Sequence, residues 1–100
     1  RRSNRIIVNG GTLIYHGGFS SKKIDISKIK KIVRDRPGFG NRKMRKDLNA
    51  YQMYIVYDVS GDGDGQVSLN DNMFTKEQLQ KIAREIYMVN SNIEIDSYYK

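Results

Sequence analysis

Only one stretch of this sequence has the spacing of a helix, and it lies close to the C-terminal end. Apolar side chains recur there at intervals of three and four residues, namely Leu79, Ile82, Ala83, Ile86 and Tyr87. That spacing places them on one face of a helix. Thr75 and Gln78 have the types and the spacing of an N-terminal capping box. We therefore predict one amphipathic helix that begins after Thr75 and ends near Val89.

The residues before this helix are divided by glycines into lengths that suit strands. Segments 5–8 and 12–15 flank Asn9-Gly10-Gly11. Asn-Gly tolerates the positive φ angles of a type I′ turn, so we predict a hairpin there. Residues 23–26 alternate polar and apolar side chains, and residues 27–33 are predicted to continue as another strand after a bend.

The middle of the chain predicts a second hairpin. Residues 50–59 alternate and are rich in tyrosine and β-branched side chains, which is typical of a long strand. The glycine-rich segment 60–65 is predicted to be the turn, and residues 66–69 the returning strand.

Strands followed by a single helix indicate an α+β fold. We expect a strongly bent antiparallel sheet, capped by one C-terminal amphipathic helix. The domain is predicted to span residues 5–95, with residues 1–4 and 96–100 as flanking termini or linkers. The segment 93–100 either adds an edge strand or is a linker.

Composition excludes several kinds of site. A length of 100 residues suits one small domain. The chain has no Cys, which excludes disulfides, thiolate metal sites and cysteine nucleophiles, and it has a single His. His16 lies beside a Gly-Gly pair, so we interpret it as a turn residue rather than a catalytic one. We predict no enzymatic activity and no cofactor.

The two ends of the chain differ in charge. Residues 1–46 hold 14 of the 18 Lys and Arg but only two of the 11 acidic residues, whereas the remainder is net acidic. Such asymmetry favours docking on an anionic partner. The alternative is that the basic half complements the acidic half within one fold.

Most of the basic residues gather between positions 22 and 46, and Phe39 lies in the loop part of this segment. We predict an anionic-surface binding set of Lys22, Lys23, Lys28, Lys30, Lys31, Arg34, Arg36, Phe39, Arg42, Lys43, Arg45 and Lys46. Each basic residue near acidic lipid contributes ~1 kcal/mol of attraction, and Phe39 would supply an apolar contact. A nucleic-acid backbone ranks lower as a partner, because no aromatic stacking residues are interleaved with these charges.

Residues 58–71 contain acidic and small residues with partial likeness to a calcium-binding loop. Asp58, Asp62, Asp64 and Asp71 are the candidate ligands. The position of the bidentate acid, however, is occupied by Leu69. A hairpin turn rich in Asp and Gly is the simpler interpretation.

Several phrases of the sequence resemble those of bacterial pleckstrin-homology-like (PH-like) domains. These phrases are LIYHGG (13–18), IDISKIKKI (24–32), YQMYIVYD (51–58), QVSL (66–69), FTKEQLQKIAREI (74–86) and NSNI (90–93). The resemblance implies a seven-stranded, strongly bent sheet, as a barrel or sandwich, closed at one corner by the helix. It also implies a binding or scaffolding module of a larger bacterial protein. The first hairpin lacks the basic phosphoinositide motif of eukaryotic members.

These observations predict a non-enzymatic, cytoplasmic module at the inner face of the membrane, docked by its basic half on anionic lipid. The alternative is a homo-oligomeric or partner-protein interaction domain that uses an exposed sheet edge. Because the sequence begins with Arg1-Arg2, we expect it to be one part of a longer chain, where this pair would suit a position after a transmembrane segment.

Overall fold

The structure is a computed structural model, and it describes residues 5–17, 20–35, 51–60 and 63–100. In chain order the elements are β1 (Arg5–Asn9), β2 (Thr12–Gly17), β3 (Ser20–Asp25), η1 (Ile26–Lys28), β4 (Ile29–Asp35), β5 (Gln52–Val59), β6 (Gly63–Asn70), α1 (Lys76–Val89), β7 (Glu94–Ile95) and η2 (Ser97–Tyr99). The α+β class and the single α-helix of the described residues agree with the sequence analysis. α1 ends at Val89, as predicted.

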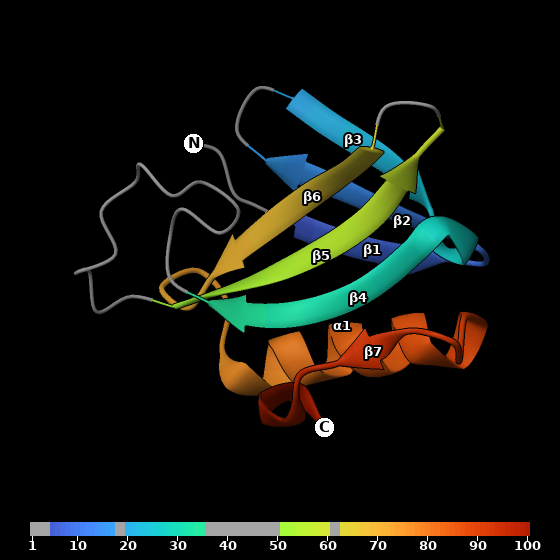
Figure 1. Cartoon of the computed structure of the whole chain (residues 1–100). Coiled ribbons are helices and arrows are strands. Elements are labelled where there is room, and N and C mark those ends of the chain that lie inside the picture. Colours follow the sequence, from blue (N-terminus) through green and yellow to red (C-terminus); the bar gives the residue numbers. More distant parts are fainter. Residues whose placement is uncertain (1–4, 18–19, 36–50, 61–62) are drawn as a thin grey trace.

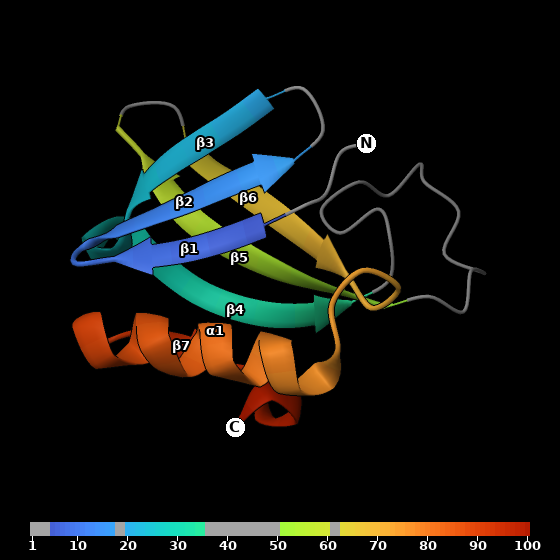
Figure 2. The same ribbon diagram turned by 180° about the vertical axis from the view of Figure 1, so that it is seen from behind.

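The described strands form two separate sheets rather than one continuous bent sheet, so of the two expected forms the sandwich describes them and the barrel does not. The first sheet has the order β1-β2-β3, and the second has the order β6-β5-β4-β7. The sheets lie face to face and do not close into a barrel (Figures 1 and 2). All pairs are antiparallel except β4 with β7, which is parallel.

A short 3-10 turn, η1, separates the two sheets at the point where the sequence predicts a bend between strands. The Asp25 carboxylate accepts hydrogen bonds from the backbone N–H of Ser27 at 3.0 Å and from its hydroxyl at 2.8 Å. These bonds lower the pKa of Asp25. They favour η1 over an extended backbone, because an Asp side chain competes with strand hydrogen bonding in this way. The chain consequently leaves the first sheet and enters the second at Ile29.

The first hairpin forms, but with a different turn from the one predicted. Asn9 pairs with Thr12, so Gly10 and Gly11 are the two loop residues. Only Gly10 has a positive φ, of 62°. A type I′ turn needs positive φ at both central residues, whereas a type II′ turn needs it at the first alone. The prediction that Asn9 would supply a positive φ was therefore wrong.

One core lies between the sheets and α1. It includes Leu13 and Ile24 from the first sheet, and Ile32, Met53, Ile55, Val67 and Leu69 from the second. Leu79, Ile82, Ala83 and Ile86 complete it from α1. Figures 1 and 2 show α1 along the open side of the two sheets, beside β1 and β4. Tyr87, predicted to belong to the apolar stripe, is 47% exposed instead.

Both ends of α1 are fixed by side chains. Thr75 Oγ1 accepts from the N–H of Gln78 at 3.1 Å, and the N–H of Thr75 donates to Gln78 Oε1 at 2.8 Å, so the predicted capping box is confirmed. At the other end Asn90 Nδ2 donates to the carbonyls of Ile26 at 3.0 Å and Ile29 at 3.1 Å. Among the described residues no helix is both long and apolar enough to span a bilayer.

Replacing Asn90 with Ala removes the two hydrogen bonds that tie the end of α1 to η1. We expect the free energy of unfolding to fall by about 1–3 kcal/mol, measured by urea denaturation. The matched control is Asn92→Ala, because Asn92 is exposed and donates only through its backbone N–H. A surface change of this kind stays within about 0.5 kcal/mol. Equal losses in the two variants would contradict the role of Asn90.

Candidate functional site

The predicted basic residues of β3 do not share one face of the sheet. Lys22 pairs with Tyr15 and Lys23 pairs with Ile14. Neighbouring residues of a strand point to opposite faces. Both lysines are exposed, but they cannot dock together on one flat anionic surface through the same sheet face.

Two basic residues of η1 and β4 contact the neighbouring hairpin. Lys28 Nζ donates to Ser60 Oγ at 3.2 Å, and Lys30 Nζ is 3.0 Å from Asp64 Oδ1. The hydrogen bond to Asp64 raises the pKa of Lys30. Lys31 is half-buried on the same strand. Here the basic half complements acidic and polar groups of the second half of the chain.

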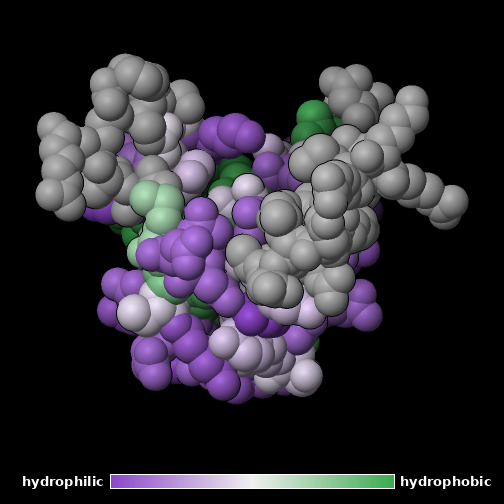
Figure 3. Space-filling view, turned by 90° about the vertical axis from the view of Figure 1, so that its left-hand side faces the viewer, coloured by the Kyte–Doolittle hydropathy of each residue, from purple (hydrophilic) through white to green (hydrophobic). Residues whose placement is uncertain are grey.

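Arg34 is half-buried at the end of β4. Its guanidinium forms two hydrogen bonds with the Asp71 carboxylate, at 3.0 and 3.3 Å. It also stacks on the ring of Tyr98 at 3.7 Å from the centroid and on Tyr51 at 4.6 Å. The described surface at this end of β4 is mostly hydrophilic (Figure 3). The geometry assigns Arg34 to holding the C-terminal segment, not to an exposed cationic patch.

The remaining members of the predicted anionic-surface set lie outside the described residues. They are Arg36, Phe39, Arg42, Lys43, Arg45 and Lys46.

The acidic calcium candidates are not brought together. Asp64 and Asp71 stand at opposite ends of β6, which places them about 23 Å apart at ~3.3 Å per residue. Asp64 is paired with Lys30 and Asp71 with Arg34, while Asp58 is the cross-strand partner of Asp64. Asp62 lies outside the described residues. No group of three metal-binding side chains occurs in the part of the chain that the structure describes.

His16 lies within β2 rather than in the turn that follows it. It is half-buried, and its cross-strand partners are Arg5 and Ser21.

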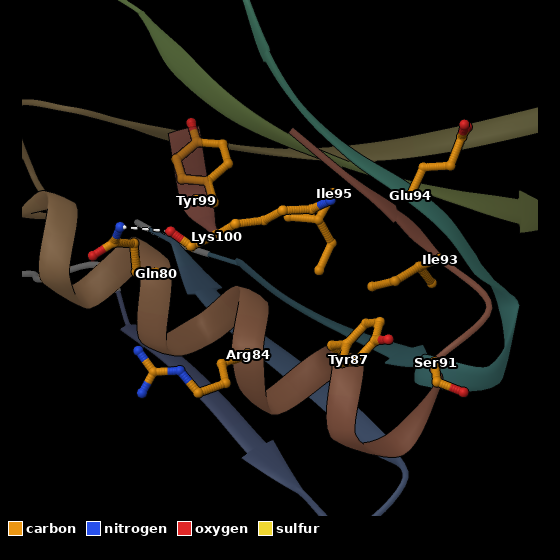
Figure 4. A pocket seen from close by; sticks show the side chains of 9 residues that line it. All are labelled: Gln80, Arg84, Tyr87, Ser91, Ile93, Glu94, Ile95, Tyr99 and Lys100. Atoms are coloured by element: carbon orange, nitrogen blue, oxygen red, sulfur yellow. Dashed lines mark hydrogen bonds between the residues drawn. The ribbon is translucent and has the colours of Figure 1, made fainter. Parts of the chain in front are cut away.

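A groove lies between α1 and the C-terminal segment. Its volume is about 710 Å³, within the ~300–1,000 Å³ range typical of ligand sites. Its lining residues come from α1 on one side and from residues 91–100 on the other, namely Gln80, Arg84, Tyr87, Ser91, Ile93, Glu94, Ile95, Tyr99 and Lys100 (Figure 4).

The groove follows the free edge of the second sheet. β7 is the last strand of that sheet and pairs only with β4. Asp96 N–H donates to the Ile32 carbonyl at 2.9 Å, so the residues on either side of Ile95 bond to β4. In a parallel ladder the intervening residue then directs its own N–H and C=O away from β4. Neither group of Ile95 has a hydrogen-bond partner in residues 5–17, 20–35, 51–60 or 63–100.

Contacts from β4 and α1 hold this C-terminal wall in place. Arg34 of β4 stacks on Tyr98, and Lys76 of α1 lies on the same ring, 4.5 Å from its centroid. Gln80 Nε2 donates to the carbonyls of Tyr98 at 3.5 Å and Lys100 at 3.4 Å. The segment therefore forms the edge strand that was one of its two predicted alternatives.

Sequence reasoning did not identify this groove. Two signals point to it in retrospect. Gln80, Arg84 and Tyr87 share one side of α1 because they are spaced by four and three residues, and Ile93-Glu94-Ile95 alternates as a strand does. Neither signal shows that the two segments face each other, because that requires the parallel pairing of β7 with β4.

Comparison with models of known protein families, with curated proteins and with solved structures finds no match to this chain. The site is therefore interpreted from its own geometry.

The Tyr99 hydroxyl provides a test of how firmly the C-terminal segment is held. It is buried and has no hydrogen-bond partner among the described residues. Burial raises the pKa of Tyr99 from 10.0 to about 12, although the Arg34 guanidinium opposes this change. The folded protein thus keeps this proton at a pH where the unfolded chain has lost it. The stability contributed by neutral Tyr99 is fully present below pH 10 and is lost as the pH rises towards 12.

In the wild type, ionisation of Tyr99 should lower the free energy of unfolding as the pH rises. Tyr99→Phe should abolish this contribution, measured by chemical denaturation between pH 9 and 12. At neutral pH the variant should differ from wild type by less than about 1 kcal/mol, since the hydroxyl makes no bond that is lost. Tyr87→Phe is the control, because Tyr87 is 47% exposed. If both variants follow the wild-type pH profile, the segment does not exclude water from Tyr99.

Proposed function

We propose that the protein is a non-enzymatic interaction module that binds an extended segment of a partner protein in the groove between α1 and β7. The observation that carries the proposal is the edge of β7. The unpaired N–H and C=O of Ile95 are directed away from β4, and the groove runs beside them. An extended peptide would pair with these groups and add a strand to the sheet.

The side chains of the groove suit such a peptide. Ile93 and Tyr99 are buried, and the half-buried Ile95 lies beside them. Tyr87 contributes an exposed aromatic ring from α1. Tyrosine is frequent at the centres of protein interfaces, because its ring buries apolar area while its hydroxyl stays hydrated. Backbone pairing would supply affinity, and this apolar surface would accept one side chain of the peptide.

The proposal includes a relationship to PH-like domains. Two packed sheets followed by a capped helix support it. The arrangement departs from the expected one in two respects. Six described strands precede α1, and the seventh, β7, follows it and pairs in parallel with β4.

Ile95→Pro tests the free edge directly. Proline has no N–H, but the N–H of Ile95 is not one of those that bond to β4. The substitution should therefore abolish peptide binding while the sheet remains intact. We would select binders from a random 12-residue display library on wild-type protein, and then titrate the enriched peptide into ¹⁵N-labelled protein. Wild type should show chemical-shift changes at Ile95, Arg84 and Tyr87.

Ile95→Val is the matched control, because it keeps the N–H and has a side chain about the size of proline. It should bind the enriched peptide within threefold of wild type. Amide spectra of both variants would establish that they are folded. Failure to enrich any peptide, or shift changes confined to other surfaces, would overturn the proposal. A concentration-dependent dimer with shifts at the groove would assign the site to a second copy of this chain instead.

A second candidate function, docking on anionic lipid, is favoured by one face of the first sheet. Ile7 is 37% exposed and lies opposite Ile14 on the outward face. Arg5 and Lys23 extend from the same face, by the alternation of β1 and β3. No described helix or strand lies over this face (Figure 2). An apolar centre flanked by cations suits an acidic bilayer surface.

The lipid proposal predicts co-sedimentation with vesicles of phosphatidylserine and phosphatidylcholine, but not with phosphatidylcholine alone. Binding should weaken as salt rises, because exposed charges are screened. The double change Arg5→Glu and Lys23→Glu should abolish it. The double change Lys81→Glu and Arg84→Glu alters the net charge by the same amount, but on α1. Most of the vesicle binding should remain in this variant. Equal loss in both variants, or no sedimentation, would contradict docking through this face.

A further inference from the structure

The two ends of the groove differ in charge. Figure 4 shows Gln80 and Arg84 towards one end and Ser91 and Glu94 towards the other, while the Lys100 side chain extends from the first end towards Ile95. Arg84 and Lys100 are exposed, and neither forms an ion pair with any residue that the structure describes. Arg84 at one end of the groove and Lys100 along it are therefore cationic side chains that pair with no acid among the described residues.

A third cation extends this end along α1. Lys76, Gln80 and Arg84 follow one another at intervals of four residues, which places them in one row on the helix surface. Lys76 rests on the ring of Tyr98, which holds it beside the C-terminal segment. The row consists of two cations and one amide, and no acid interrupts it.

Two acids outside α1, Asp71 and Asp96, already have partners. Asp71 is held by the Arg34 guanidinium, and Asp96 accepts a hydrogen bond from the N–H of Tyr98 at 2.9 Å. Glu94 is exposed at the opposite end. The distribution disfavours a basic peptide near Arg84 and favours an acidic one.

We propose that the segment bound in the groove is acidic, with an Asp or Glu placed against Arg84 and an apolar residue against Ile95 and Tyr87. This inference rests on the proposed function, because it specifies the chemistry of the occupant of the same groove. Since the peptide pairs with β7, its side chains alternate between the groove and solvent. The acidic residue must then fall at a fixed distance along the peptide from the residue that pairs with Ile95.

Charge reversal at Arg84 tests the inference. The display selection is run in parallel on wild type, Arg84→Glu and Lys81→Glu. Lys81 is the matched control, because it is an exposed cation on α1 that does not line the groove. Wild type and Lys81→Glu should both enrich peptides with Asp or Glu at one position. Arg84→Glu should enrich Lys or Arg at that position.

Affinities then give the size of the effect. The acidic peptide selected on wild type should bind Arg84→Glu about threefold to tenfold more weakly, the range expected when one partly exposed charge pair becomes repulsive. Replacing its acidic residue with Gln or Asn should weaken binding to wild type but not to Arg84→Glu. Comparing the single changes with the combined change measures the interaction between Arg84 and the acidic residue of the peptide, separately from any effect of net charge.

The outcomes separate the inference from the function on which it rests. If no selection enriches a peptide, the proposed function fails. If wild type and Arg84→Glu enrich the same peptides without an acidic position, and shifts map to the groove, peptide binding holds and the acidic preference is wrong. If Lys81→Glu changes the selected motif as much as Arg84→Glu does, the preference reflects net charge and the assigned contact is wrong.

Discussion

The apolar stripe of α1 is the feature on which the rest of this structure depends. The two sheets share no hydrogen-bonded pair among the described strands, so backbone pairing alone does not hold them together. Leu79, Ile82, Ala83 and Ile86 bury one face of the helix against both sheets. Burial of the leucine and the two isoleucines contributes ~1.5–3 kcal/mol each. Loss of the helix would expose the core of both sheets at once, and it would also remove one wall of the groove.

The C-terminal segment depends in turn on α1 and β4. β7 pairs over only two residues, and parallel pairing is slightly weaker per residue than antiparallel pairing. The contacts of Arg34 with Tyr98 and Asp71 supplement that short ladder. Charged residues that in the sequence suggest an exposed basic surface therefore form contacts within the protein instead. Arg34, Lys30 and Lys28 each bond to a side chain from residues 60–71.

Local patterns predicted the helix, its capping box and most strands, because those features depend on neighbouring residues. Long-range pairing was not predictable in this way. The segment Ser60–Gly65 was expected to be a turn, yet β6 begins at Gly63. Gly65 is a strand residue opposite Tyr57, and a Cβ there would lie 2.5 Å from the Tyr57 ring. This glycine makes room for the Tyr57 ring across the strand pair, a role that composition alone cannot distinguish from a turn. The groove escaped prediction for the same reason, since its walls meet only after β7 pairs with β4.

The small size of the domain explains why the groove lies beside an exposed strand edge. A domain of this size cannot cover every strand edge, and exposed edges promote unwanted association. β7 limits that hazard by being two residues long, and α1 stands beside it, so only a chain narrow enough to enter the groove can reach the N–H and C=O of Ile95. Steric restriction by α1 and the uncompensated charge of Arg84 act on the same edge. Together they would convert a general tendency of sheets to add strands into selection of one kind of extended, acidic segment.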